Sequence, residues 1–129
     1  MANLKGRIGV EHYKTNISND NHTLIADEPL EDGGTDLGFS PYDLVLAALA
    51  SCTAITLRMY ADRKKWNLTG VDVDIHFEPK TDAGQVFTRS ILLSGELTDD
   101  QKSKLLLIAN ACPIHKLLTT PTIINTQLI

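Results

Sequence analysis

The sequence predicts an α+β fold in which an antiparallel sheet packs against one long central helix. Three observations support this class. Helix-forming residues run almost unbroken over residues 40–65, and apolar and polar residues alternate over residues 71–78 as in a half-buried strand. The expected strands also follow one another as hairpins, which favours antiparallel pairing. We therefore expect the order β-β-α-β-β-α-β in a single domain, residues 1–129.

The composition is that of a mildly acidic globular chain. Its 129 residues are 43% apolar, which is enough for a hydrophobic core, and the net charge is −4. This balance disfavours nucleic acid or an anionic membrane surface as the main partner. The N-terminus lacks the apolar run of a signal peptide, so we expect a cytoplasmic location. In that reducing compartment, two cysteines do not form a structural disulfide framework.

The residues before the long helix predict two strands and a loop. Strands are expected at Arg7–Tyr13 and His22–Asp27, with the polar residues between them as a hairpin connection. The stretch Pro29–Gly38 is rich in glycine and aspartate and predicts a loop. Its glycine pair lacks the spacing and the lysine of a phosphate-binding loop, so we interpret it as a turn.

The stretch Ser40–Lys65 carries the strongest helix signals. Ser40 suits the N-cap and Pro41 the first helical position, while basic residues suit the C-terminal end of the helix dipole. At about 1.5 Å per residue the helix is roughly 35–40 Å long. Apolar residues surround it almost completely, so we expect more cover than one small monomer provides. Its apolar segment Asp43–Ile55 is too short to span a membrane.

The second half of the chain predicts a hairpin, a second helix and a last strand. Thr98 and Gln101 have the form of a capping box, which begins the second helix. Pro121 precedes a β-branched stretch, as is common at the start of a strand. The expected elements are the strand Val71–Phe77, the turn Pro79–Gly84, the strand Val86–Leu97, the helix Asp99–Cys112, a helical turn at Ile114–Leu118 and the strand Thr122–Ile129.

The two cysteines, Cys52 and Cys112, each have two interpretations. Free cysteine is among the most buried residue types, so each can be a plain core residue. A reactive cysteine needs a stabilised thiolate that an oxidant can reach. Cys52 lies in the middle of the long helix, too far from its N-terminus for the dipole to help. A cation or hydrogen-bond donor would therefore have to come from elsewhere in the fold.

Cys112 and His115 are separated by two residues, as in half of a zinc site. A metal site needs two further ligands, and no candidate is paired at a useful spacing, so this is the weaker interpretation and we expect no cofactor. His115 can instead raise the thiolate fraction of Cys112. The further candidate ligands are Cys52, His12, His22 and His76.

Two segments around the cysteines are distinctive. The first, residues 38–53, reads GFSPYDLVLAALASCT, and the second, residues 111–116, reads ACPIHK. Together they resemble the OsmC/Ohr family, the osmotically induced and organic-hydroperoxide-resistance proteins. The predicted element order agrees over nearly the whole chain. The sequence LRMYADRKKW after the first cysteine is most similar to the OsmC-like branch.

The resemblance implies an intertwined homodimer in which two long helices pack between sheets that both chains build. It also implies a thiol-dependent peroxidase that reduces organic hydroperoxides, with Cys52 as the peroxidatic thiolate and Cys112 as the resolving cysteine. A dithiol, such as a protein-bound dihydrolipoyl group, would restore both thiols. Tyr42, Asp43 and His115 are the supporting residues that we expect, and no metal or organic cofactor is implied.

One position departs from the family pattern. Peroxidase members have a glutamate that pairs with an arginine, whereas this chain has Tyr42, followed by Asp43. A tyrosine cannot form the ion pair of a carboxylate, so we expect the stabilisation of the thiolate to be different, weaker or absent. The candidate replacement cations are Arg7, Lys14, Arg89 and Lys116. The alternative function is a non-catalytic protein of this fold that binds a small apolar or electrophilic molecule, with packing cysteines.

Overall fold

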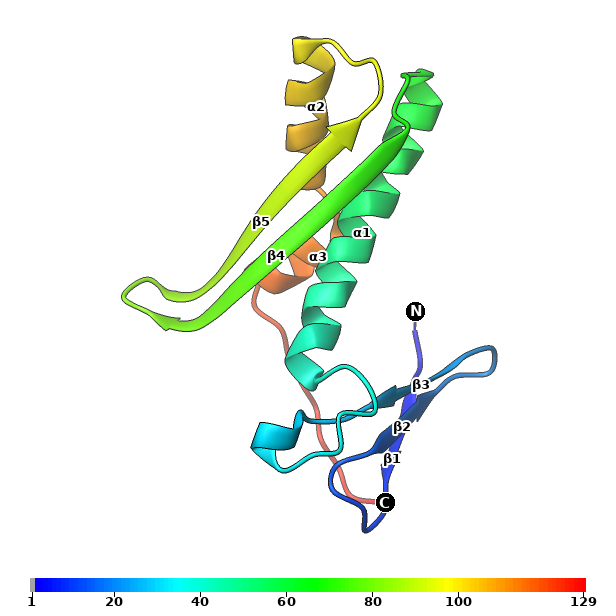
Figure 1. Cartoon of the computed structure of the whole chain (residues 1–129), viewed down its shortest axis with the longest axis vertical. Helices are drawn as coiled ribbons and strands as arrows, with labels where there is room; N and C mark the ends of the chain where they lie inside the picture. Colours follow the sequence, from blue (N-terminus) through cyan, green and yellow to red (C-terminus); the bar gives the residue numbers. More distant parts are fainter. Residues whose placement is uncertain (1) are drawn as a thin grey trace. The chain divides into compact units, whose positions relative to one another are not determined.

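The computed structural model describes residues 2–129 (Figure 1). The chain forms two compact units, residues 1–47 and residues 48–129, and each is described by itself. A single domain over residues 1–129 stays a prediction. The elements in order are β1 (Lys5–Ile8), β2 (Thr15–Ser18), β3 (Thr23–Ala26), the short 3-10 helix η1 (Leu30–Asp32), α1 (Pro41–Lys64), β4 (Gly70–Thr81), β5 (Gly84–Ser94), α2 (Asp99–Ala109) and α3 (Pro113–Thr119).

The first unit is built on a three-stranded antiparallel sheet in the order β1-β2-β3. The buried carboxylate of Asp27 holds the loop that follows β3. It accepts hydrogen bonds from the Thr35 hydroxyl at 2.6 Å and from the backbone N–H groups of Tyr13, Glu28 and Leu37. These bonds lower the pKa of Asp27 well below its usual range. The bond from the Thr35 hydroxyl has the largest effect, and together the bonds outweigh burial, which raises the pKa. One ionised side chain therefore organises the approach to α1.

The start of α1 is fixed by a reciprocal pair of hydrogen bonds. The backbone N–H of Asp43 donates to Ser40 Oγ at 3.2 Å, and the backbone N–H of Ser40 donates to Asp43 Oδ2 at 3.2 Å. This is a capping box, which satisfies two N–H groups at the first turn. Gly38 lies just before it, where an added Cβ would be 1.9 Å from the carbonyl oxygen of Ile25. Glycine is therefore required for the close passage beside β3.

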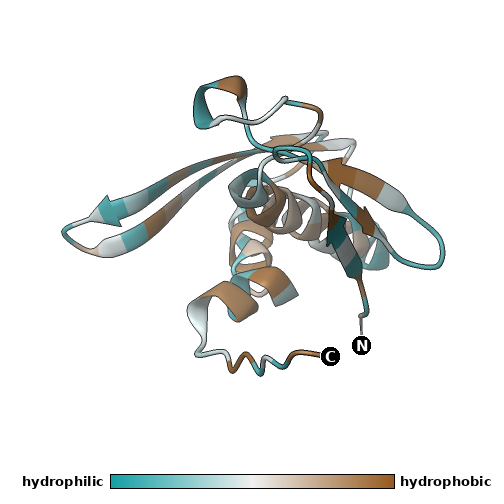
Figure 2. Ribbon diagram, turned by 90° about the horizontal axis from the view of Figure 1, so that it is seen from below, coloured by the Kyte–Doolittle hydropathy of each residue, from teal (hydrophilic) through white to brown (hydrophobic). Residues whose placement is uncertain are grey.

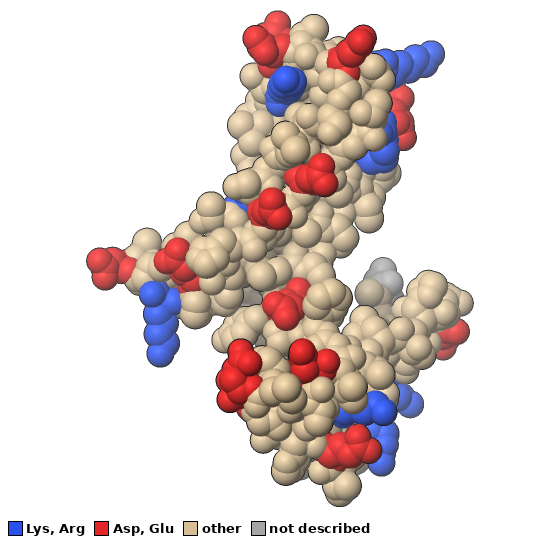
Figure 3. Space-filling model, in the orientation of Figure 1, with Lys and Arg blue, Asp and Glu red and all other residues tan. Residues whose placement is uncertain are grey.

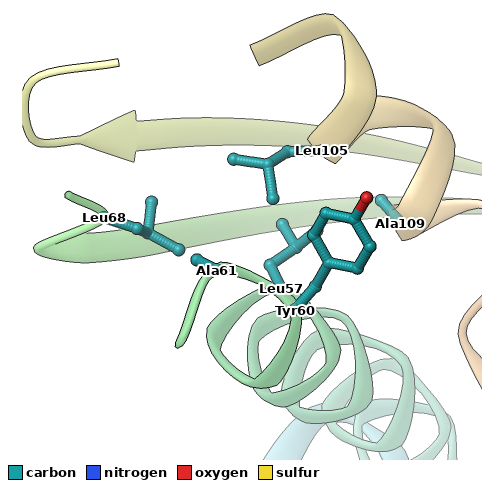
Figure 4. Close-up of a cluster of buried hydrophobic side chains, with 6 residues drawn as sticks. All are labelled: Leu57, Tyr60, Ala61, Leu68, Leu105 and Ala109. Atoms are coloured by element: carbon teal, nitrogen blue, oxygen red, sulfur yellow. The ribbon is translucent and has the colours of Figure 1, made fainter. Parts of the chain in front are cut away.

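The second unit contains a long antiparallel hairpin, β4 and β5, covered by helices (Figure 1). Apolar and polar residues alternate along β4 from Val71 to Glu78, whereas β5 contains the continuous apolar run Ile91–Leu93 (Figure 2). The inward-facing Val71, Ile91 and Leu93 pack against a core that α1 and α2 supply. Figure 4 shows side chains of the two helices meeting in this core. Its buried members are Leu57, Tyr60, Ala61, Leu68, Leu105 and Ala109.

The structure confirms the α+β class, the antiparallel pairing and the long helix. It also confirms the capping box of Thr98 and Gln101, in which each side chain accepts from the other residue's backbone N–H. The helical turn expected at Ile114–Leu118 is present as α3. On the face drawn in Figure 3, acidic and basic side chains are interspersed and no continuous basic patch forms, in line with the acidic composition.

The predicted order of elements was wrong at both ends. The strand expected at Arg7–Tyr13 ends at Ile8, and Thr15–Ser18, expected as a connection, is β2. Its polar residues form a strand because β1 and β3 pair with both of its edges. Within residues 2–129, the stretch 120–129, which contains the expected last strand Thr122–Ile129, is neither helix nor strand. β-Branched residues alone do not make a strand when no neighbouring strand pairs with them.

α1 is more exposed than its sequence predicts. Judged by length and composition alone, it could cross a membrane, and only 22% of its most apolar window is buried. The core helix of a globular protein passes the same test. Ile55 and Met59 of α1 are 58% and 67% exposed. A large part of the helix surface therefore remains available for a partner.

Candidate paired-thiol site

The second unit brings the two cysteines together. Cys52 lies in the middle of α1 and is half-buried, whereas Cys112 follows α2 and is fully buried. Cys52 is among the neighbours that lower the pKa of Cys112, and both thiols are free. Cys112 is also the N-cap of α3, with Pro113 at the first helical position. The packing of α1 against the α2–α3 junction therefore creates a pair from residues far apart in the sequence.

The sulfur of Cys112 has further hydrogen-bonding neighbours. The backbone N–H of His115 donates to Cys112 Sγ at 3.3 Å, which is the N-cap bond of α3. The hydroxyl of Thr53 lies 4.0 Å from the same sulfur. Thr53 is itself fully buried and stands next to Cys52 on α1. The Cys112 sulfur thus lies among polar groups although water does not reach it.

Arg89 of β5 ties these elements together. Its Nη1 donates to Thr53 Oγ1 at 3.0 Å, and its Nη2 donates to Asn110 Oδ1 at 3.0 Å. The same Nη2 lies 3.1 Å from His115 Nδ1. Because a guanidinium can only donate, this contact makes Nδ1 the acceptor and leaves the ring hydrogen of neutral His115 on Nε2. One half-buried cation therefore connects β5 with α1, the end of α2 and α3.

This environment lowers the pKa of Cys112. Burial acts first and raises the pKa, because it disfavours a charged sulfur. The hydrogen bonds from the His115 N–H, Cys52 and Thr53, together with the positive charge of Arg89, more than offset burial. The net pKa of the Cys112 thiol lies below its ordinary value. Cys112 is therefore held in surroundings that favour the thiolate.

The structure separates the residues predicted to support the site into two groups. His115 lies beside Cys112 and Arg89, as described above. Tyr42 and Asp43 belong to the first turn of α1, in the other unit. The capping box with Ser40 gives Asp43 a structural role.

The candidate cations are divided in the same way. Arg89 is part of the site, where it contacts Thr53, Asn110 and His115. Arg7 and Lys14 belong to the first unit, and Lys116 is exposed on α3. Arg89 is therefore the cation that the second unit supplies to Cys112.

Sequence reasoning missed Thr53 and Asn110 and did not single out Arg89. The position of Arg89 along β5 could have indicated that its side chain faces inward. Counting by two from Ile91 and Leu93, whose side chains pack on the core, places Arg89 on the same inward-facing side of the strand. A charged residue at an inward position needs a buried partner, and this can be noticed in a sequence. Asn110 offered no comparable signal, because the end of a helix is a common place for asparagine.

No metal cluster accompanies the thiols. Across residues 2–129, no group of three or more histidine, cysteine, aspartate or glutamate side chains is placed to hold a metal ion. Nδ1 of His115 faces Arg89 rather than a possible metal position. The spacing of Cys112 and His115 reflects the N-cap of α3 instead.

An apolar cleft of about 330 Å³ lies in the same unit. Leu57 in its wall is one helical turn after Thr53, and Ile91 is two residues after Arg89 on the same side of β5. Lys102 is the charged residue in the lining. Neither Cys52 nor Cys112 is among the residues that line the cleft. Its walls are formed by Leu57, Ile91, Leu92, Leu93, Lys102, Leu105 and Leu106.

Fold and site together define a small α+β protein with two free cysteines. One lies on the long helix α1 and the other at the junction of α2 and α3. The sequence profile described as OsmC-like protein matches residues 33–127. The chain therefore belongs to the OsmC-like family. Among curated proteins, none matches the chain.

Solved structures of family members share the fold. One, from Psychrobacter arcticus, is named as a candidate osmotic stress induced and detoxification response protein; it has a TM-score of 0.76 and 23% identity, over 91% of this chain and 88% of that chain. An OsmC-like protein from Mycoplasma pneumoniae has a TM-score of 0.76 and 15% identity, over 90% and 85%. The organic hydroperoxide resistance protein OhrB of Bacillus subtilis has a TM-score of 0.62 and 18% identity, over 92% and 90%. At identities this low, the structural likeness establishes the common fold and no more.

Proposed function

We propose that the protein is a thiol-dependent peroxidase that reduces organic hydroperoxides in a stress or detoxification role. The observation that carries the proposal is that Thr53, the neighbour of Cys52 on α1, lies 4.0 Å from Cys112 Sγ and accepts a hydrogen bond from Arg89 Nη1 at 3.0 Å. Two free thiols close together can store two oxidising equivalents as a disulfide. A nearby cation supplies the stabilisation that a reactive thiolate needs.

The half-exposed Cys52 takes the peroxidatic role because an oxidant can reach it. Its sulfur attacks the distal peroxide oxygen, the O–O bond breaks and an alcohol leaves, so Cys52 becomes a sulfenic acid. Cys112 then attacks the oxidised sulfur, a disulfide forms and water leaves. An external dithiol, such as a lipoyl group on a protein, reduces the disulfide by exchange. Every electron is accounted for by the two cysteines and the dithiol.

The apolar cleft supports an organic substrate. Leucine and isoleucine side chains form most of its wall, and such surface favours a hydrocarbon group over a small polar peroxide. The cleft thus gives a physical reason for an alkyl or aryl hydroperoxide rather than hydrogen peroxide.

We propose further that the protein is an intertwined homodimer in the cytoplasm. Ile55 and Met59 on α1 and Leu92 on β5, which is 64% exposed, leave apolar surface uncovered in one chain. The segment 122–129, rich in β-branched residues, is neither helix nor strand within residues 2–129. A second copy that covers α1 and pairs with this segment would account for both features.

The alternative is a binding protein without turnover. The complete burial of Cys112 favours it, because a fully buried cysteine is often only a packing residue. In that case the cleft would hold a small apolar or electrophilic molecule. The lowered pKa of Cys112 argues for the peroxidase, since a packing cysteine has no need of a cation and hydrogen-bond donors.

Consumption of cumene hydroperoxide in the presence of dithiothreitol tests the proposal. We expect turnover by the parent, loss of turnover in Cys52→Ser and unchanged turnover in Ser103→Ala, an exposed control on α2. Hydrogen peroxide should be a poorer substrate than cumene hydroperoxide. Equal rates in the parent and Cys52→Ser would rule out the peroxidase and leave the binding protein.

A further inference from the structure

The imidazole ring of His115 meets a cation rather than a carboxylate. Its Nδ1 lies 3.1 Å from Nη2 of Arg89. In residues 2–129 the ion pairs lie elsewhere, between Arg58 and Asp62 and between His76 and Glu78, so no carboxylate of the described chain pairs with this ring. A guanidinium only donates hydrogen bonds, so the contact with Arg89 is a hydrogen bond only while Nδ1 carries no proton. The contact therefore requires the neutral ring.

The groups around His115 give a second positive charge no compensation in the recorded contacts. β5 brings the guanidinium of Arg89 against the ring. Cys112, at the junction of α2 and α3, accepts from the backbone N–H of His115, not from its ring. On α1 the titratable group of the site is Cys52, and on α3 the neighbour of His115 is the exposed Lys116. Protonation of the ring thus sets a positive charge directly against Arg89.

Arg89 has a separate acceptor for each hydrogen of Nη2. Nη2 donates to Asn110 Oδ1 at 3.0 Å and to His115 Nδ1 at 3.1 Å, and Nη1 donates to Thr53 Oγ1 at 3.0 Å. These acceptors belong to the end of α2, to α3 and to α1, so together they fix the position and the rotation of the planar guanidinium. A proton on Nδ1 removes one acceptor and replaces it with a like charge. The guanidinium then loses the contact that holds it to α3.

We propose, on the basis of the proposed peroxidase function, that His115 is a positioning residue and an acid switch: its neutral ring fixes Arg89 beside the thiols, and a proton on Nδ1 releases the guanidinium. Histidine is the side chain that changes its charge between about pH 5 and 8. The guanidinium keeps its charge over this whole range. Acid therefore changes the position of the cation and not its charge, and the site is complete only in neutral or mildly alkaline solution.

Two substitutions separate the acceptor from the titrating proton. The side-chain oxygen of asparagine takes about the place of Nδ1, and it accepts hydrogen bonds without ionising. His115→Asn thus keeps the acceptor for Arg89 at every pH, whereas His115→Ala removes it at every pH. The matched control is His76→Asn, because the ring of His76 is exposed on β4. Circular dichroism checks that each variant is folded.

Carbon-detected nuclear magnetic resonance of the Arg89 guanidinium tests the contact without turnover. A fixed guanidinium gives two Nη resonances, and a freely rotating one gives a single averaged resonance. The signal is assigned by its absence in Arg89→Gln. The parent and His76→Asn should show two resonances at pH 8 and one at pH 5, His115→Asn two at both, and His115→Ala one at both. Two resonances in the parent at both pH values, or the parent's change in His115→Asn, would overturn the inference.

The single-turnover rate of cumene hydroperoxide consumption by the reduced protein tests the consequence. The ratio of the His115→Asn rate to the parent rate should be near one at pH 8 and rise on the order of tenfold at pH 5, as expected for the loss of a hydrogen bond to a charged group. His115→Ala should be slower than the parent at pH 8 and equal to it at pH 5. A ratio that stays constant from pH 5 to pH 8 would overturn the switch. Absence of peroxide consumption by the parent would refute the proposed function, whereas the resonances of Arg89 decide the role of His115 independently.

Discussion

At the scale of single residues, the site depends on one cation. The guanidinium of Arg89 bonds to Thr53 and Asn110, and its charge contributes to the lowered pKa of Cys112. Arginine suits this place because its planar fork reaches several acceptors at once, which a lysine ammonium cannot reproduce. We propose that Arg89 takes the place of the glutamate–arginine pair that position 42, a tyrosine, cannot form. The residue was among the cations considered in the sequence, but its partners depend on folding.

Replacing Arg89 should shift the pH dependence of the thiol reaction. The folded-state pKa of Cys112 is lowered, so loss of the cation raises it and the thiolate forms only at higher pH. We expect the pH profile of cumene hydroperoxide consumption to move to higher pH in Arg89→Gln and to move less in Arg89→Lys. The control is Lys104→Gln, an exposed cation on α2 that should leave the profile unchanged. An identical profile in the parent and Arg89→Gln would show that the cation does not act on the thiol.

Asp27 makes the first unit sensitive to acid. Its pKa is lowered in the folded chain, so its contribution to stability is complete above the ordinary aspartate pKa of about 3.9 and is lost as the pH falls below that value. Asp27→Asn should therefore lower stability at neutral pH and weaken the dependence on acid between about pH 5 and pH 2. Urea unfolding at several pH values measures both effects. A constant difference between variant and parent at every pH would contradict this role.

At the scale of elements, local signals predicted the structure well. The capping residues Ser40 and Thr98 both act as the sequence indicated, because a cap bonds to neighbours three residues away. The alternation over β4 likewise depends on adjacent residues. Thr15–Ser18 became a strand only because two neighbours pair with it. The proximity of Cys52 to Cys112 depends on how α1 packs on the α2–α3 junction, which no local pattern specifies.

The capping box of α2 has a measurable effect. Thr98→Ala removes the side chain that accepts from the backbone N–H of Gln101, so α2 loses one cap bond. We expect a decrease of about 1 kcal/mol in the free energy of unfolding, measured by chemical denaturation. Ser103→Ala, at an exposed position in the middle of α2, is the matched control and should not lower the stability. A decrease of equal size in both variants would mean that the cap does not stabilise α2.

At the scale of the whole molecule, the apolar surface of α1 is the main feature that one chain leaves unexplained. Its sequence is apolar almost all round, yet Ile55 and Met59 are mostly exposed. The sequence already indicated a helix too long and too apolar for one monomer. The final segment adds to this: its β-branched residues predicted a strand, and one chain offers no partner for it. Both features favour the proposed homodimer.

A charge on the exposed side of α1 should separate the subunits. Ile55→Glu places a carboxylate where a second helix is expected to pack, so the dimer should dissociate at least partly into monomers. Size-exclusion chromatography with light scattering measures the mass of each species. Lys104→Glu changes the charge on α2 and should leave the mass unchanged. A parent protein with the mass of a single chain would contradict the dimer.

The most direct test of the central claim is the oxidation state of the two cysteines after reaction with one equivalent of cumene hydroperoxide. Mass spectrometry of the peptides, after free thiols are alkylated, identifies the product. The account predicts a disulfide between Cys52 and Cys112 within one chain, together with one equivalent of alcohol. Recovery of Cys112 as a free, alkylated thiol while Cys52 is oxidised further to a sulfinic acid would contradict it.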